Sequence, residues 1–157
     1  MTILPKPMQI RRLAFVILFS LLAHTYALAQ VNINLEVSGQ DALGARLAES
    51  LRDSLRKRRI FQISPDATSA DATLWLGTLD PMDGRLAGLQ TVYSVVITMK
   101  TLDERRVNVY VNSYLGVCGR EQTSQCGTAL ADAAEAQLSE VLSVLKERVG
   151  QPVLAPK

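Results

Sequence analysis

Histidine and cysteine are both scarce: the 157 residues include one His and two Cys. The histidine, His24, lies in an N-terminal stretch that we expect to be removed, so the mature chain would contain no imidazole. Ser-His-Asp and Cys-His arrangements and histidine general bases are thereby excluded. A zinc site uses about four ligands, drawn mostly from Cys and His, and two cysteines do not supply them. Glycine-rich phosphate loops and the EF-hand spacing are also missing, so we expect no metal and no cofactor.

Paired carboxylates are the acid–base chemistry that remains. Asp80 with Asp83, and Asp103 with Glu104, are the close pairs, and each lies in a predicted turn beside Pro, Gly or Arg. Acids in turns usually serve turn geometry and contact solvent. We therefore predict no catalytic residue and no enzyme activity. A secreted hydrolase or toxin that uses carboxylates alone remains an alternative.

The first 29 residues have the pattern of a cleavable signal peptide. Residues 6–12 carry three positive charges and no negative charge, and the apolar stretch 13–23 follows. At about eleven residues this stretch suits a signal-peptide core and is short for a membrane span. Ala27-Leu28-Ala29 is a small-x-small cleavage site, so we expect Gln30 to begin the mature chain. The alternatives are a buried N-terminal helix or an uncleaved anchor. The pattern predicts a periplasmic or secreted protein with no transmembrane segment after cleavage.

The positive formal charge of the whole chain belongs largely to that segment. Cleavage after Ala29 removes three of the 17 basic residues and none of the 15 acidic ones, which leaves a formal charge of −1. Overall attraction to nucleic acid or anionic lipid is therefore not expected. Residues 30–150 are predicted to form one domain, followed by a flexible tail over residues 151–157.

The two cysteines, Cys118 and Cys126, are expected to form a disulfide. Export places them in an oxidising compartment, where two lone cysteines usually pair. Seven residues separate them, so they do not form the C-x-x-C motif of redox enzymes. A disulfide that closes so short a loop stabilises a protein by about 2–3 kcal/mol. Labile or intermolecular pairing is the alternative.

Hydrophobic periodicity places the secondary structure. Alternating apolar and polar residues predict strands, as in Val31–Val37, which is expected to have one solvent-exposed face. Leucines at every fourth position predict an amphipathic helix, which Ser38 and Asp41 would begin as a capping pattern. The predicted strands cover residues 31–37, 60–63, 72–79, 90–102 and 107–117, and the predicted helices cover residues 41–58 and 128–149.

This order predicts an α+β fold: a four- to five-stranded mixed or antiparallel sheet with two amphipathic helices packed on one face, in the order β-α-β-β-β-β-α. The strands 90–102 and 107–117 are expected to pair as an antiparallel hairpin. Its valines would face inward, with Tyr110 and Tyr114 on the opposite face. Trp75 lies between Leu74 and Leu76, so we expect it in the core.

Two surfaces are candidates for binding a partner. One is the basic cluster at the end of the first helix, which either docks an acidic partner or polyanion or simply complements the helix dipole. The other is the predicted Tyr/Asn face of the last strand, since tyrosine makes rigid amphipathic contacts; a half-buried sheet surface is the alternative. Phe61 is the only aromatic residue beside the basic cluster, so nucleic-acid binding is not expected. The candidate residues are Arg52, Arg56, Lys57, Arg58, Arg59, Tyr110, Asn112 and Tyr114.

Residues 47–64 (LAESLRDSLRKRRIFQIS) and 70–80 (ADATLWLGTLD) resemble exported bacterial α/β domains. The order of elements over residues 31–115 and the ADA…LG segment are similar to the N-terminal domain of the periplasmic protein TolB. They also resemble small outer-membrane accessory domains that activate cell-wall synthases. The resemblance implies a non-enzymatic protein–protein adaptor. The chain departs from it by lacking TolB's β-propeller and a lipidation cysteine, and no family site residue is carried over.

Together these observations predict an exported, disulfide-bonded, non-enzymatic adaptor or binding module of the bacterial envelope, with an envelope protein as its partner. Besides the hydrolase, the other alternative is a carrier of a lipid-like ligand, which would need a sizeable apolar cavity between helix and sheet. The sequence leaves the partner and the oligomeric state open.

Overall fold

The computed structural model describes residues 30–39, 41–101 and 106–149. The predicted signal peptide, the predicted tail over residues 151–157 and the pair Asp103–Glu104 lie outside the described residues. The elements, in chain order, are β1 (Val31–Ser38), α2 (Ala42–Arg56), β2 (Phe61–Ile63), β3 (Ala72–Leu79), a 3-10 turn (Gly84–Leu86), β4 (Gln90–Lys100), β5 (Asn108–Gly119), a second 3-10 turn (Arg120–Gln122) and α3 (Thr123–Val149).

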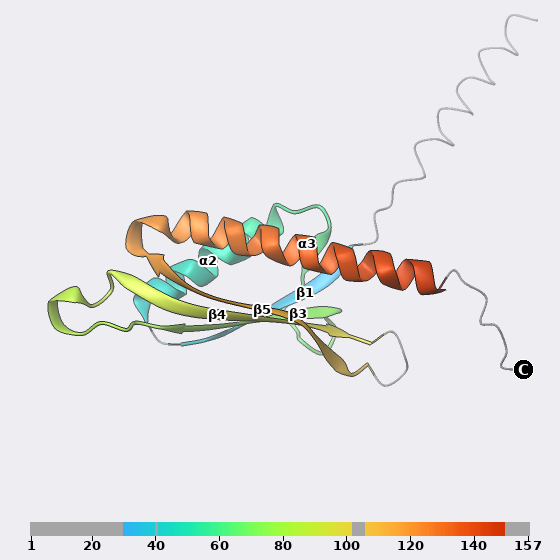
Figure 1. The fold of residues 1–157 in the computed structure, drawn as a ribbon, viewed down its shortest axis with the longest axis horizontal. Helices are drawn as coiled ribbons and strands as arrows, with labels where there is room; N and C mark the ends of the chain where they lie inside the picture. The colour runs from blue at the N-terminus through green and yellow to red at the C-terminus, as the bar shows by residue number, and fades with distance from the viewer. Residues whose placement is uncertain (1–29, 40, 102–105, 150–157) are drawn as a thin grey trace, which may run out of the picture.

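The strands form one five-stranded sheet in the order β2-β1-β3-β4-β5. β1 pairs in parallel with β2 and β3, whereas β4 pairs antiparallel with both β3 and β5. Both helices lie on the same face of this sheet (Figure 1). The predicted α+β class, mixed sheet and order of elements are confirmed.

The core fills the space between the helices and that face of the sheet. Leu47, Leu51 and Leu55 of α2 are fully buried, as their spacing predicts. They pack with alternate residues of the sheet and with the first half of α3. The sheet residues in this core include Ile33, Leu74, Leu76, Val95, Ile97 and Met99.

Two helix beginnings differ from the predicted ones. Ser38 is the last residue of β1, and Asp41 alone caps α2: its carboxylate accepts the backbone N–H of Gly44 at 2.6 Å. α3 begins at Thr123, five residues earlier than predicted. Cys126 therefore lies in the first turn of α3, and its disulfide with Cys118 joins that turn to β5. The predicted disulfide is confirmed.

A β-bulge in β5 overturns the predicted Tyr/Asn face. Ile97 lies opposite Asn112, but the next residue, Thr98, lies opposite Tyr110, so Val111 is an extra residue in β5. An extra residue reverses the alternation of side chains along the strand. Asn112 and Tyr114 therefore lie on the helix-covered side, whereas Tyr110 lies on the open face. No pattern in the sequence marks this bulge.

Trp75 is not in the core, contrary to the prediction. It lies on the face of β3 away from the helices, with 44% of its surface exposed, and its indole N–H donates to the Thr98 hydroxyl at 3.2 Å. Side chains alternate normally along this strand, and both helices of the described residues cover the other face, so Trp75 lies on the uncovered one.

The solvent-exposed face predicted for β1 is only partly exposed: Asn32 and Glu36 are half-buried. Asn34 is buried, because the connection between β2 and β3 crosses β1 on this face. The Asn34 amide donates to the Ser64 carbonyl, and the Asp71 carboxylate accepts from the Asn32 backbone and side chain.

Candidate functional site

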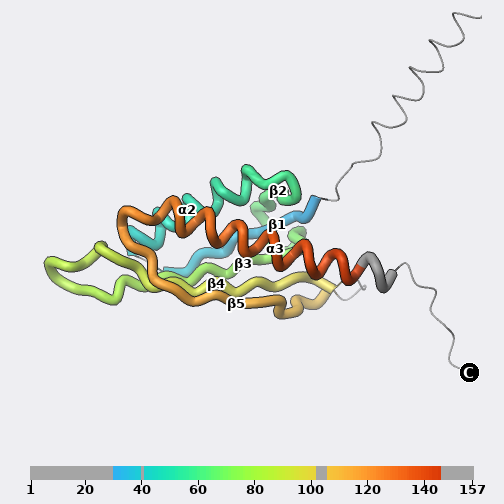
Figure 2. The backbone as a smooth tube through the Cα atoms, turned by 45° about the horizontal axis from the view of Figure 1, so that its top comes forward, coloured from blue at the N-terminus to red at the C-terminus, as the bar shows by residue number. Residues whose placement is uncertain are grey.

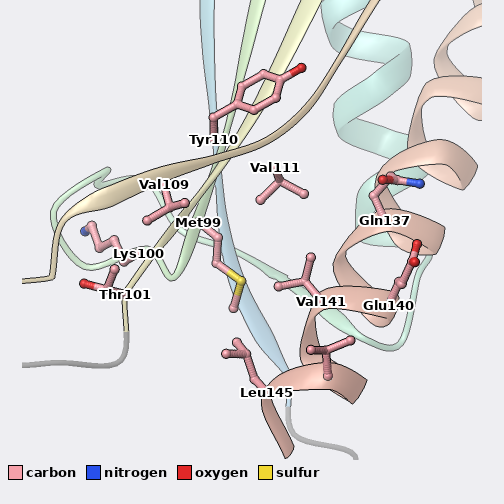
Figure 3. Close-up of a pocket in the computed structure, with 11 residues that line it drawn as sticks. Met99, Lys100, Thr101, Val109, Tyr110, Val111, Gln137, Glu140, Val141 and Leu145 are labelled. Atoms are coloured by element: carbon pink, nitrogen blue, oxygen red, sulfur yellow. The ribbon is translucent and has the colours of Figure 1, made fainter. Parts of the chain in front are cut away.

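An apolar groove lies between the second half of α3, the end of β4 and the beginning of β5. Its volume is about 640 Å³. From the sheet, Met99, Val109 and Val111 contribute to the lining, and Val141, Val144 and Leu145 line it from α3. Figure 3 shows Met99, Val111 and Val141 pointing into the space between helix and sheet. A groove of this size lies in the range of about 300–1,000 Å³ that is usual for small-molecule sites.

The described polar residues beside the groove do not form a catalytic arrangement, because two of them are hydrogen-bonded to other parts of the protein. The Lys100 ammonium donates to the backbone carbonyls of Ala67 and Thr68, away from the groove. The Gln137 side chain accepts from Asn112 at 3.0 Å. Glu140 is the one acid among the described residues that line the groove. The groove is thus suited to holding an apolar group.

The bulge in β5 contributes directly to this groove. Before the bulge, Val109 and Val111 are on the helix side, and Val109 lies opposite Met99. After it, the helix side is continued by Asn112, whose amide contacts α3. The stripe of apolar residues on α3 was visible in the sequence, but the apolar surface that faces it depends on the bulge.

The opposite face of the sheet is the second candidate surface. Within the described residues no helix covers it, and large apolar side chains from β3 and β5 are exposed there. Leu115 is the most exposed, at 79%. Cross-strand pairing places them in neighbouring rows: Trp75 faces Val96, and Leu79, Val92 and Val117 share a row. We call this surface the open face; its exposed large apolar residues are Trp75, Leu79, Tyr110, Leu115 and Val117.

The predicted basic cluster is mostly neutralised by neighbouring acids. Arg52 pairs with Glu49, and Arg56 pairs with Asp53, each three residues away on α2. Arg58 reaches across to α3 and pairs with Asp132 and with Glu135, the latter at 3.2 Å. Lys57 and Arg59 are exposed and form no ion pair in the described part of the chain. Such partners weaken the cluster as a site for a polyanion.

The structure gives two turn carboxylates, Asp80 and Asp66, structural roles, whereas Asp83 forms no side-chain hydrogen bond at the 3-10 turn that it precedes. Asp80 accepts the backbone N–H groups of Met82 and Gly88 and so closes the loop between β3 and β4. Hydrogen bonds from the Thr68 hydroxyl and backbone N–H hold the pKa of Asp66 below its usual value of 3.8. No group of three or more His, Cys, Asp or Glu residues suited to a metal ion occurs among the described residues. Nor is any helix in the described ranges long and apolar enough to cross a bilayer.

The comparisons with known proteins identify the fold. No family model matches the sequence, and no curated protein matches it either. A solved structure of a Xanthomonas campestris protein of the DUF330 family is similar, with a TM-score of 0.55 and 7% identity over 76% of this chain and 92% of that one. This chain shares its fold.

Weaker structural similarity extends to two further proteins. The PelC dodecamer from Paraburkholderia phytofirmans has a TM-score of 0.41 and 12% identity, over 66% of this chain and 84% of that one. A minor lipoprotein from Acinetobacter baumannii has a TM-score of 0.31 and 16% identity, over 69% and 92% of the two chains. At these values neither comparison carries an argument about function.

Proposed function

We propose that this chain is an exported, non-enzymatic adaptor of the bacterial envelope that binds a protein partner through the open face. The observation that supports the proposal most directly is the group of large apolar side chains exposed on that face. Extended apolar patches on soluble proteins mark interaction sites, because exposing them to water is unfavourable. Trp and Tyr, both present here, are frequent among residues that contribute most to binding.

The rest of the molecule is consistent with binding rather than catalysis. Asp80 stabilises a loop and Glu135 pairs with Arg58, and the predicted mature chain contains no histidine. The disulfide between β5 and α3 suits an oxidising compartment. A turnover activity abolished by Asp80→Asn would contradict this proposal.

Photo-crosslinking in cells tests the open face. A photo-crosslinking amino acid at Trp75 or at Tyr110 is expected to capture the same envelope protein. Position 56 on α2, on the other side of the sheet, serves as the control and is expected to capture nothing. Capture from position 56 alone would instead favour the basic cluster as the binding surface and contradict the open face.

The purified partner then permits a quantitative prediction. Trp75→Ala is expected to weaken binding about 30-fold, since residues at the centre of an interface contribute about 2 kcal/mol or more. Leu86→Ala, at an exposed apolar position in the first 3-10 turn, is the matched control and is expected to change the Kd less than threefold. Isothermal titration calorimetry measures both, and equal Kd values for the two variants would count against the open face.

The groove favours a second candidate function, a carrier of a lipid-like molecule. The described part of its lining matches an apolar chain, and the one cation in that part, Lys100, is bonded to backbone carbonyls. A neutral fluorescent probe, N-phenyl-1-naphthylamine, is expected to bind there.

Val144→Asp would place a carboxylate in the groove and is expected to weaken probe binding about tenfold or more. Val37→Asp is the matched control, since Val37 has similar exposure (40%, against 45% for Val144) and lies outside the groove. Fluorescence titration distinguishes them. A wild-type chain that fails to bind the probe, or equal binding by both variants, would eliminate the carrier.

A further inference from the structure

The two edges of the sheet are protected very differently. The β2 edge is a strand of three residues, and Pro65 follows shortly after it. The β5 edge is twelve residues long and has no proline and no charged residue in its sequence, NVYVNSYLGVCG. Proteins normally protect long edge strands with charge, proline or cover, because unpaired backbone groups bind other strands. In β5 the bulge is the one such device. Figure 2 shows β5 along the margin of the sheet opposite β2.

The direction of the unpaired backbone groups follows from one hydrogen bond. The Arg120 N–H donates to the Leu89 carbonyl at 2.9 Å, just beyond the pair Gln90–Gly119. In an antiparallel ladder, successive residues point their N–H and C=O groups alternately toward and away from the partner strand. Counting back from Arg120 as far as the bulge, Ser113, Leu115 and Val117 therefore direct their N–H and C=O groups away from β4. In agreement, the Ser113 N–H is satisfied locally by the Asn112 side chain at 2.7 Å.

We propose that the β5 edge, centred on Leu115 and Val117, pairs antiparallel with the β5 edge of a second copy of this chain. The geometry would be a twofold-symmetric dimer in which two five-stranded sheets become one continuous sheet. This inference goes beyond the adaptor function and does not depend on it.

The composition of β5 favours a second copy over an unrelated strand. In a twofold antiparallel pair the strand faces itself, so any charge in it would lie near the same charge of the other copy. β5 has none, and like-charge repulsion is absent. Assembly also stops at the dimer, because the two β5 edges pair with each other and only the short β2 edges remain exposed.

The dimer would enlarge the binding surface. The twofold axis of an antiparallel edge pair is perpendicular to the sheet, so the helices of both copies lie on one side. The two open faces then join on the other side, with Leu115 and Val117 of each copy beside the new junction. A partner that contacts both halves would bind with increased avidity.

Sedimentation velocity of the mature chain, residues 30–157, over a micromolar concentration series tests the proposal. The wild-type chain is expected to be a dimer. Val117→Pro removes an outward N–H without removing a bond to β4, and Val117→Lys adds the charge that protected edges carry. Each is expected to raise the dimer Kd about tenfold or more, and far-UV circular dichroism establishes that each variant is folded.

Leu79→Lys is the matched control, because Leu79 is similarly exposed and lies in the same cross-strand row of the open face, on the interior strand β3. It is expected to leave the dimer intact. A monomeric wild-type chain, a dimeric Val117→Pro variant, or assemblies that grow without limit would overturn the proposal. Disruption by Leu79→Lys as strong as by Val117→Lys would also overturn it, because the faces rather than the edges would then be in contact.

Discussion

Replacement of Gly127 by leucine is expected to lower the free energy of unfolding by about 3 kcal/mol, at the upper end of what overpacking usually costs. Gly127 lies where α3 crosses α2. A Cβ atom there would come within 2.3 Å of the Ser50 hydroxyl and 2.8 Å of the Leu51 backbone nitrogen. Because backbone atoms are in the way, the side chain cannot be accommodated by a change of rotamer. The two helices would have to separate, and the core beneath them would loosen.

The same crossing predicts an unusual result for alanine. In most helices Gly→Ala stabilises by about 1 kcal/mol, whereas Gly127→Ala is expected to destabilise. Gly119→Ala is the matched control: its Cβ would meet only the Gln122 side chain, at 3.7 Å, and the φ of Gly119 is −77°. That substitution is expected to be neutral or to stabilise by about 0.5 kcal/mol. Urea denaturation measures all three variants, and a Gly127→Leu variant as stable as wild type would show that the helices do not cross so closely.

Removal of the disulfide, as Cys118→Ser with Cys126→Ser, is expected to lower the free energy of unfolding by about 2.5 kcal/mol. The bonded residues are eight apart in sequence, and restricting a loop of that length in the unfolded chain gives this value. Cys118 is also fully buried, so a serine hydroxyl there adds a desolvation cost. For a chain of this size the melting temperature would fall by about 10 °C.

A reducing agent provides the control for this prediction. The wild-type chain is expected to melt at a lower temperature in the presence of reductant, whereas the double serine variant melts at the same temperature with and without it. Differential scanning calorimetry measures both chains. If reductant left the wild-type melting temperature unchanged, the disulfide would not stabilise the fold.

The sequence by itself determined the α+β class, the order of the elements and the disulfide. These follow from local rules: apolar periods of two and of about 3.6 residues, leucines at every fourth position in α2, and two lone cysteines in a chain whose first 29 residues have the pattern of an export signal. The predicted boundaries of the strands were also close to the observed ones, because turn residues flank each strand. The end of α2 was two residues from the predicted one, and the beginning of α3 was five.

The tertiary structure decided where the candidate surfaces lie. Trp75, between two leucines, resembles a core residue in sequence, and only the placement of both helices on one face leaves it exposed. The extra residue Val111 places Tyr110 and Tyr114 on opposite faces of the sheet. A bulge has no reliable signal in the local sequence. Arg58 appeared in the sequence as one charge of a basic cluster, whereas its acidic partners are on a helix more than 70 residues away.

The groove, the open face and the β5 edge share this origin. Each depends on which elements lie side by side and which side remains uncovered, and that is set by the order β2-β1-β3-β4-β5 rather than by any single segment. Periodicity in the sequence shows that a strand or helix has an apolar side. The surface that covers this side comes from residues far away in the chain, so only the folded arrangement shows whether it is buried or left open to a partner.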